Sequence, residues 1–146
     1  MRVLIVEDDP ILALLAEIAL QEGGHDVLGP ALSASQALAM AAQKLPDIAL
    51  VDINLNGQDE GVDLVKALYH DYGVHSLYVS GQIEVARENS DYAVGLLSKP
   101  YSPNDLAQSA QIVHDLVKRR LPLPSLLPDQ LTIFTKSCGL TGTRHV

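Results

Sequence analysis

Several absences narrow what this chain of 146 residues can be. It has one cysteine, Cys138, which cannot form a disulfide within the chain and is typical of a protein from a reducing compartment. No run approaches the roughly 18 to 20 apolar residues that span a bilayer. The amino terminus also lacks the basic segment and apolar stretch of a secretory signal. We therefore expect a cytoplasmic protein that does not enter a membrane.

Positive charge and aromatic side chains are scarce as well. The chain has 10 Lys and Arg against 18 Asp and Glu, which gives a formal net charge of −8. A general nucleic-acid surface needs a basic face, so this balance argues against one. Hydrophobic residues make up 47% of the chain but aromatic residues only 4%, which predicts an aliphatic core. The length fits one domain with a full core.

What the chain does have is a regular alternation of strand-like and helix-like segments. Short apolar runs typical of buried parallel strands occupy residues 3–6, 48–51, 77–79 and 95–98, and a weaker strand lies near 25–29. Helices are predicted after Asp9, after Ser33, over 62–72, over a short polar stretch within 82–92, and after Ser102. The pattern predicts an α/β fold: a doubly wound (βα)5 flavodoxin-like domain with a five-stranded parallel sheet in the order 2-1-3-4-5 and a short, irregular fourth helix.

The buried faces of two helices can also be predicted from spacing. In the first helix, an apolar stripe is expected to face the core, made of Ile11, Leu14, Leu15, Ile18 and Ala19. In the helix over 62–72, the residues expected to point inward are Leu64, Val65 and Leu68.

Polar residues follow four of the predicted strands. Glu7 and Asp8 follow the first strand, Asp52 the third, Ser80 the fourth and Lys99 the fifth. Taken singly, each could be a helix cap, a turn residue or a solvated charge. Carboxyl ends of parallel strands meet at one edge of the sheet, however, and four complementary groups there form a site. Crowded carboxylates attract a cation, so the residues outline a Mg²⁺ and phosphoryl site.

These segments resemble a known family. Residues 3–9, Val51-Asp52, Val79-Ser80 and Ser98-Lys99-Pro100 are similar to the receiver domain of two-component response regulators, over roughly residues 1–120. The resemblance implies that Asp52 is the phosphoacceptor and that Glu7 and Asp8 form the acidic pair.

The same resemblance assigns the remaining site residues. Asp8 and Asp52 would bind Mg²⁺ directly, and the backbone carbonyl of Asn54 would add an oxygen ligand. Ser80 would bind the phosphoryl group, and Lys99 would pair with a phosphoryl oxygen. The Lys99–Pro100 peptide bond is expected to be cis, which only an X–Pro bond adopts readily.

Three details differ from the commonest receivers. The step from Ser80 to Lys99 is 19 positions, which is short and predicts a short or irregular fourth helix. Leu96 stands where an aromatic residue is frequent, so an aromatic rotamer switch is not expected. The loop after Asp52 carries Asn56-Gly57 in place of a Met-Pro pair. With Gly81 after Ser80, the chain is similar to the subgroup whose fourth strand ends in a Thr/Ser-Gly pair, common among stand-alone and stress-response receivers.

The function that the resemblance implies is that of a single-domain response regulator. It would accept a phosphoryl group from a sensor histidine kinase or a histidine phosphotransfer protein, as in a phosphorelay. It would then signal by contact with an unknown downstream protein or act as a phosphate sink, with no enzyme activity beyond its own phosphorylation and dephosphorylation.

Two alternatives belong to other classes. A metal-dependent phosphohydrolase with an Asp nucleophile usually has a second Asp two positions later as general acid, where this chain has Asn54. A receiver-like adaptor that is never phosphorylated would not need Asp8, Asp52, Ser80 and Lys99 together.

Residues 121–146 are interpreted as a C-terminal tail without an effector domain. They are too few for a helix-turn-helix domain, so direct DNA binding is not expected. The simplest interpretation is a frayed extension. The alternative is that its apolar residues dock on the domain or on a second copy: Leu126, Leu127, Ile133 and Phe134. A homodimer would form through this tail, or through the face made by the fourth helix, the fifth strand and the fifth helix.

Overall fold

Strands and helices alternate along the chain from its first residues. The computed structural model describes residues 1–134, so Cys138 lies outside the described part. Five strand–helix pairs are followed by one short strand: β1 (Arg2–Val6), α1 (Pro10–Glu22), β2 (Asp26–Ala31), α2 (Ala34–Gln43), β3 (Ile48–Val51), α3 (Glu60–Tyr72), β4 (His75–Ser80), α4 (Ile83–Glu88), β5 (Ala93–Ser98), α5 (Pro103–Val117) and β6 (Leu131–Ile133). The predicted α/β class is therefore confirmed, including a short fourth helix of six residues.

The strands form a single sheet in the order β2-β1-β3-β4-β5-β6. The first five are parallel in the predicted order, and β6 lies antiparallel to β5. The sixth strand differs from the five-stranded expectation. The physical reason is that β5 would otherwise be an edge strand with unpaired backbone groups, and the apolar, extended β6 pairs with these groups. A Cβ at Gly95 would collide with the carbonyl oxygen of Thr132, so glycine at this position allows the close pairing.

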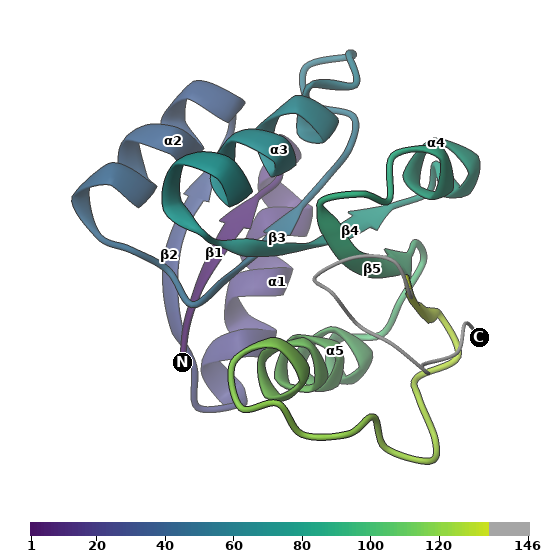
Figure 1. The fold of residues 1–146 in the computed structure, drawn as a ribbon. Helices are drawn as coiled ribbons and strands as arrows, with labels where there is room; N and C mark the ends of the chain where they lie inside the picture. The colour runs from purple at the N-terminus through teal and green to yellow at the C-terminus, as the bar shows by residue number, and fades with distance from the viewer. Residues whose placement is uncertain (135–146) are drawn as a thin grey trace.

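Helices cover both faces of the sheet, as a right-handed parallel sheet requires. Figure 1 shows α2 and α3 on one face and α1 and α5 on the other. The core is accordingly divided into two clusters. One lies under α2, α3 and α4 and includes Leu64, Val65 and Leu68, whose predicted inward orientation is confirmed. The other lies under α1 and α5 and includes Leu20 and Leu106.

The orientation of α1 differs from the prediction. Most of the stripe expected in the core faces outward: Ile11 is 71% exposed, Leu14 54%, Leu15 51% and Ile18 42%. The buried residues are mainly small ones, namely Ala13, Ala16, Ala19 and Leu20. Small side chains let α1 pack closely on the sheet and on α5. The prediction of the other face was wrong because apolar residues occur on several sides of this helix, so hydrophobic periodicity alone does not identify the buried face.

Local sequence explains where the site-forming helices begin. The Asp9 carboxylate accepts hydrogen bonds from the backbone N–H groups of Ile11 and Leu12, and Pro10 occupies the first turn of α1. Ser102 caps α5 in the same way. The predicted cis peptide bond between Lys99 and Pro100 is confirmed. Within residues 1–134, no helix has the length and apolar character needed to cross a bilayer.

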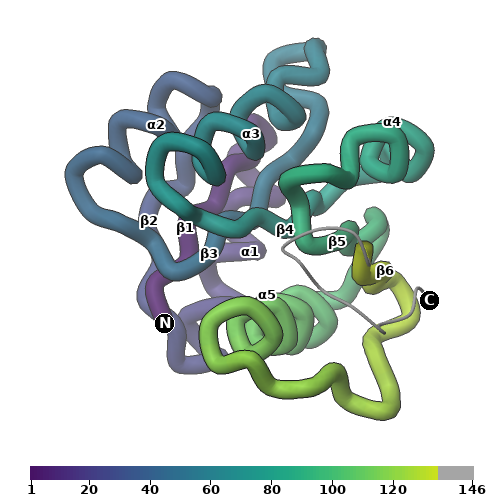
Figure 2. Tube along the Cα trace, viewed as in Figure 1, coloured from purple at the N-terminus to yellow at the C-terminus, as the bar shows by residue number. Residues whose placement is uncertain are grey.

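The segment between α5 and β6 is extended and largely exposed. It contains Pro122, Pro124 and Pro128, of which Pro122 and Pro124 lie close enough to α5 to prevent its continuation. Leu126 is 85% exposed, whereas Leu127 and Leu123 pack partly against the α5 side of the core. The tube in Figure 2 follows this segment past α5 to β6, beside β5.

Candidate functional site

The sheet brings the predicted site residues to one edge. Glu7 and Asp8 follow β1 and Asp52 follows β3, and these two strands are neighbours with Val6 paired to Val51. Ser80 ends β4, and Lys99 follows β5. The carboxyl ends of these four parallel strands therefore converge at one place, which is where ligands bind in open α/β sheets.

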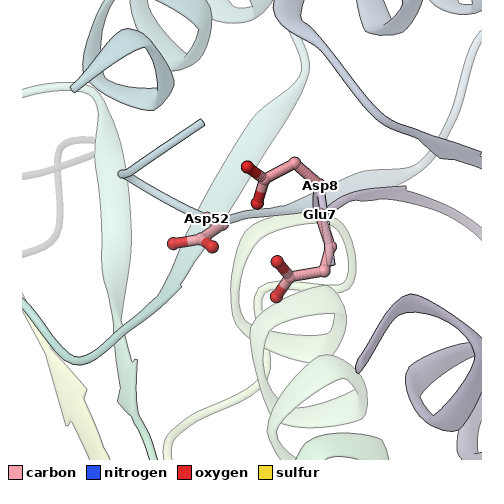
Figure 3. Close-up of side chains that lie close together, drawn as sticks. All are labelled: Glu7, Asp8 and Asp52. Atoms are coloured by element: carbon pink, nitrogen blue, oxygen red, sulfur yellow. The ribbon is translucent and has the colours of Figure 1, made fainter. Parts of the chain in front are cut away.

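Three carboxylates form the centre of this edge. Glu7, Asp8 and Asp52 each offer an oxygen atom, and these oxygens all lie within 4.8 Å of one another (Figure 3). Glu7 and Asp52 are almost fully buried, at 6% and 7% exposed, and Asp8 is partly exposed. Such close negative charges repel one another unless a cation neutralises them.

Backbone N–H groups orient each of the three carboxylates. The N–H of Asp9 donates to Glu7 Oε2 at 3.2 Å, and the N–H of Asn56 donates to Asp8 Oδ2 at 2.9 Å. The N–H of Asn54 donates to Asp52 Oδ1 at 3.3 Å. These bonds fix the carboxylates while leaving other lone pairs of each group free to accept a ligand.

Lys99 supplies the positive charge of the site. Its Nζ lies 2.8 Å from Glu7 Oε1 and 3.3 Å from Asp52 Oδ2. Burial alone would lower the pKa of Lys99, but its hydrogen bonds and the charges of Glu7 and Asp52 raise it above the ordinary value. Lys99 therefore stays protonated and bridges the two buried carboxylates.

Burial also affects Glu7. It raises the pKa of Glu7 above its ordinary value, and the negative charge of Asp52 adds to this, while the hydrogen bond from Lys99 opposes it. A proton thus competes for Glu7 at a higher pH than it would for an exposed glutamate.

Ser80 and Asn54 take different places at this edge. Ser80 is buried, its Oγ accepts a hydrogen bond from the N–H of Gln82 at 3.0 Å, and its carbonyl accepts one from the N–H of Lys99. Ser80 therefore lies beside the strand end that carries Lys99. Asn54 is exposed, and its N–H is used by Asp52. The metal-binding role of its carbonyl stays a prediction.

The donor set suits a hard divalent cation. Mg²⁺ prefers oxygen ligands and is bound in proteins through a few carboxylates while it keeps some of its water. Glu7, Asp8 and Asp52 offer oxygen atoms only, close enough together to share one ion. The residues present at this edge therefore fit Mg²⁺.

Two further residues shape the site and were not predicted from the sequence. A Cβ at Gly61 would collide with the backbone of Asp52 and Ile53, and the N–H of Gly61 donates to Ile53 O at 2.9 Å. Glycine here lets the start of α3 lie against the end of β3, and a glycine within the first turn of a helix was the available signal. Tyr101 is partly buried beside Lys99, and burial raises the pKa of its hydroxyl.

A shallow apolar groove borders the site on the α1 side. It has a volume of about 310 Å³ and runs between α1 and the start of α5, where Leu12, Leu15, Pro100 and Tyr101 line it together with Lys99. Leu15 also belongs to the exposed stripe of α1, so the groove connects this apolar helix face with Lys99.

Comparisons with known proteins agree with this geometry. The family model described as the response regulator receiver domain matches residues 3–111. The phyllosphere-induced regulator PhyR of Methylorubrum extorquens is 30% identical over 109 residues, which cover 73% of this chain and 40% of that protein. The DNA-binding response regulator MtrA of Mycolicibacterium smegmatis is 33% identical and matches 72% of this chain and 46% of its own length. The chain thus spans less than half the length of these two relatives.

Solved structures show the same fold. The receiver domain of NtrX from Brucella abortus superposes with a TM-score of 0.69 at 26% identity, over 75% of this chain and 94% of that one. A sensor protein from Polaromonas sp. JS666 also gives a TM-score of 0.69, at 38% identity, over 78% of this chain and 95% of that one.

Proposed function

Because this chain belongs to the response regulator receiver domain family, we propose that it accepts a phosphoryl group on Asp52 from a sensor histidine kinase or a histidine phosphotransfer protein, in a Mg²⁺-dependent reaction. The phosphorylated protein then acts by contact with a downstream protein, or the transfer itself drains phosphoryl groups from the donor. Residues 1–120 form the receiver domain in this proposal, and β6 adds a strand to its sheet from the segment that follows.

The observation that supports this function best is the arrangement around Asp52. Its carboxylate lies beside two further carboxylates and within 3.3 Å of the Lys99 ammonium, in a nearly buried position. A carboxylate nucleophile needs positive charge close by, because negative charge develops on the phosphoryl oxygens during transfer. Lys99 is placed to supply part of that charge.

The transfer step uses these groups as follows. A carboxylate oxygen of Asp52 forms a bond to phosphorus while the phosphorus–nitrogen bond of the donor's phosphohistidine breaks. The electron pair of that bond stays on the imidazole nitrogen, which then takes up a proton. Lys99 pairs with a phosphoryl oxygen, and the hydroxyl of Ser80 donates a hydrogen bond to another.

Magnesium has a defined place in this proposal. Glu7, Asp8, Asp52 and the carbonyl of Asn54 would hold the ion, which would neutralise charge on the phosphoryl oxygens when bound. The position two residues after Asp52 is Asn54, whose amide cannot act as a general acid, so the proposal does not extend to hydrolysis of phosphate esters.

The exposed face of α1 supports a protein donor. Ile11, Leu14, Leu15 and Ile18 are spaced as one side of a helix, and such a face packs well against another helix. The groove beside Lys99 continues from this face to the site. A donor helix on α1 would therefore bring a histidine to Asp52, and we place the donor there.

The net charge of −8 argues against specific DNA binding by the chain itself. In this respect we propose that it differs from MtrA, which is described as DNA-binding. We also propose that it acts in the cytoplasm, where donor kinases present their phosphohistidine.

The test of this proposal is phosphoryl labelling of the pure protein. We expect acetyl phosphate, or a phosphorylated kinase, to label the wild type with Mg²⁺ and not after chelation with EDTA. The Asp52→Asn variant should not be labelled, because the nucleophile is gone. Asp26→Asn is the matched control, since Asp26 is an exposed aspartate on β2. Labelling retained in the Asp52→Asn variant would contradict the proposal.

A further inference from the structure

The last described strand occupies the free edge of β5. Gly95, Leu96 and Leu97 of β5 pair with Ile133, Thr132 and Leu131 of β6, respectively. The N–H of Phe134 extends the ladder by donating to Val94 O at 2.8 Å. Figure 2 shows β6 beside β5, far from the other sheet edge at β2.

Apolar side chains fasten β6 to both faces of the sheet. Leu131 and Ile133 are fully buried in the cluster under α1 and α5. Phe134 is 4% exposed and belongs to the cluster on the opposite face, under α2, α3 and α4. The docked strand is therefore a packed part of the domain, although the segment leading to it is largely exposed.

One polar contact fixes the end of β6 that lies nearest to the site. The N–H of Ser98 donates to Gln130 O at 2.9 Å, and Ser98 Oγ donates to Gln130 Oε1 at 2.8 Å. Ser98 is paired across the sheet with Ser80 and directly precedes Lys99. Ser98, which holds Gln130, is thus the sheet neighbour of Ser80 and the chain neighbour of Lys99, the two residues assigned to phosphoryl binding.

We propose that docking of β6 on β5 is coupled to occupation of the Asp52 site, so that a phosphoryl group on Asp52 loosens β6. The coupling passes from Ser80 and Lys99 to Ser98, and from Ser98 to Gln130. This inference rests on the proposed function, because it needs a phosphoryl group at Asp52.

The direction follows from the contacts. Without a phosphoryl group, Lys99 binds Glu7 and Asp52, and Ser80 Oγ accepts from Gln82. A phosphoryl group on Asp52 offers new acceptors to both side chains and draws them toward the centre of the site. Ser98 is paired with Ser80 and directly precedes Lys99, so a shift of these two residues toward the site pulls Ser98 away from Gln130 and lengthens the bonds between them.

Hydrogen exchange in the full chain tests this coupling. Beryllofluoride with Mg²⁺ serves as the probe, since it mimics a phosphoryl group on a carboxylate. We expect it to speed exchange of the Phe134 amide about fivefold or more, at the lower end of typical coupling between two sites. Amides in α2, which packs over β1 and β2 at the other edge of the sheet, should not change. Asp52→Asn should abolish the effect.

A pair of variants tests the contact itself. Gln130→Ala removes the side-chain bond to Ser98, so β6 should exchange faster without the probe, and beryllofluoride should add less than a twofold change. Ser125→Ala, an exposed change in the same segment, should respond like the wild type. An unchanged Phe134 amide in a protein that binds beryllofluoride would overturn the coupling alone, as would a full response in Gln130→Ala. Failure to bind beryllofluoride at all would overturn the proposed function and the coupling with it.

Discussion

Glu7 combines two roles that depend on its charge. It accepts the shorter of the two bonds from Lys99, and it is one of the three carboxylates that fit Mg²⁺. Its carboxylate is nevertheless buried, which favours the protonated form. The protonation state of Glu7 therefore controls how much positive charge the site can hold.

This conflict predicts a pH dependence of metal binding. Metal ligands must be deprotonated, so Mg²⁺ should raise the melting temperature most at neutral pH. The effect should shrink as the pH falls through the raised pKa of Glu7, to the smaller effect that Asp8 and Asp52 support without the charge of Glu7. In the metal-free protein, the pH dependence of stability that Glu7 causes has the opposite sign. The preference of the folded state for protonated Glu7 stabilises the protein fully below pH 4.5, and this stabilisation is lost as the pH rises through the raised pKa of Glu7.

Thermal unfolding with and without Mg²⁺ across this range measures both effects. The control is Glu7→Gln, in which Mg²⁺ should raise the melting temperature less than in the wild type. In this variant the effect of Mg²⁺ should also fall off at a lower pH. An effect of Mg²⁺ that is as large in acid as at neutral pH would show that Glu7 is not a ligand.

Among the described elements, α1 has the most large apolar side chains that face solvent and do not pack in the core. Its small residues pack inward and its large apolar residues face solvent, which is unusual for a helix on an open sheet. An exposed apolar stripe commonly marks an interaction surface. Because a groove joins this stripe to Lys99, a change on α1 should affect the donor's access and leave the chemistry at Asp52 intact.

A comparison of two leucines tests that separation. Leu14 on α1 and Leu45 after α2 are each 54% exposed. Leu14→Asp should slow phosphoryl transfer from a cognate kinase at least tenfold, which corresponds to about 1.4 kcal/mol, and should leave labelling by acetyl phosphate unchanged. Leu45→Asp should change neither rate. Equal transfer rates for the two variants would exclude α1 as the donor surface.

The elements also show how far sequence reasoning reaches. Asp52, Ser80 and Lys99 could be placed together because each comes at the end of a strand-like run, and parallel strands end at one edge. The buried face of α1 could not be predicted, since alanines and larger apolar residues both occur around this helix. A judgement from hydrophobicity places the larger side chains in the core, whereas the structure buries mainly the alanines. The contact between Ser98 and Gln130 joins residues 32 positions apart, and no local pattern predicts it.

At the scale of the whole molecule, β6 raises the question of where the domain ends. The boundary at residue 120 follows from the end of α5, and β6 pairs across it with β5. Buried side chains of residues 131–134, namely those of β6 and of Phe134 directly after it, contribute to both core clusters. We therefore expect residues 131–134 to unfold together with the sheet in one cooperative transition.

Truncation of one buried side chain tests this expectation. Ile133→Ala should lower the free energy of unfolding by about 2 to 5 kcal/mol, as for other buried isoleucines. Leu126→Ala, 85% exposed in the preceding segment, should change it by less than about 0.5 kcal/mol. Denaturant unfolding followed by circular dichroism measures both. A negligible effect of Ile133→Ala would mean that β6 is not part of the cooperative unit.

The position of β6 at the end of the described chain has a consequence for synthesis. The first five strands can pair as soon as β5 has left the ribosome, but the edge of β5 stays bare until residues 131–134 follow. Unpaired edges of sheets attract strands from other chains. Chains that stop between residues 120 and 130 would therefore carry a complete acidic site and an uncovered edge, and we expect them to aggregate during expression where the full chain stays dispersed.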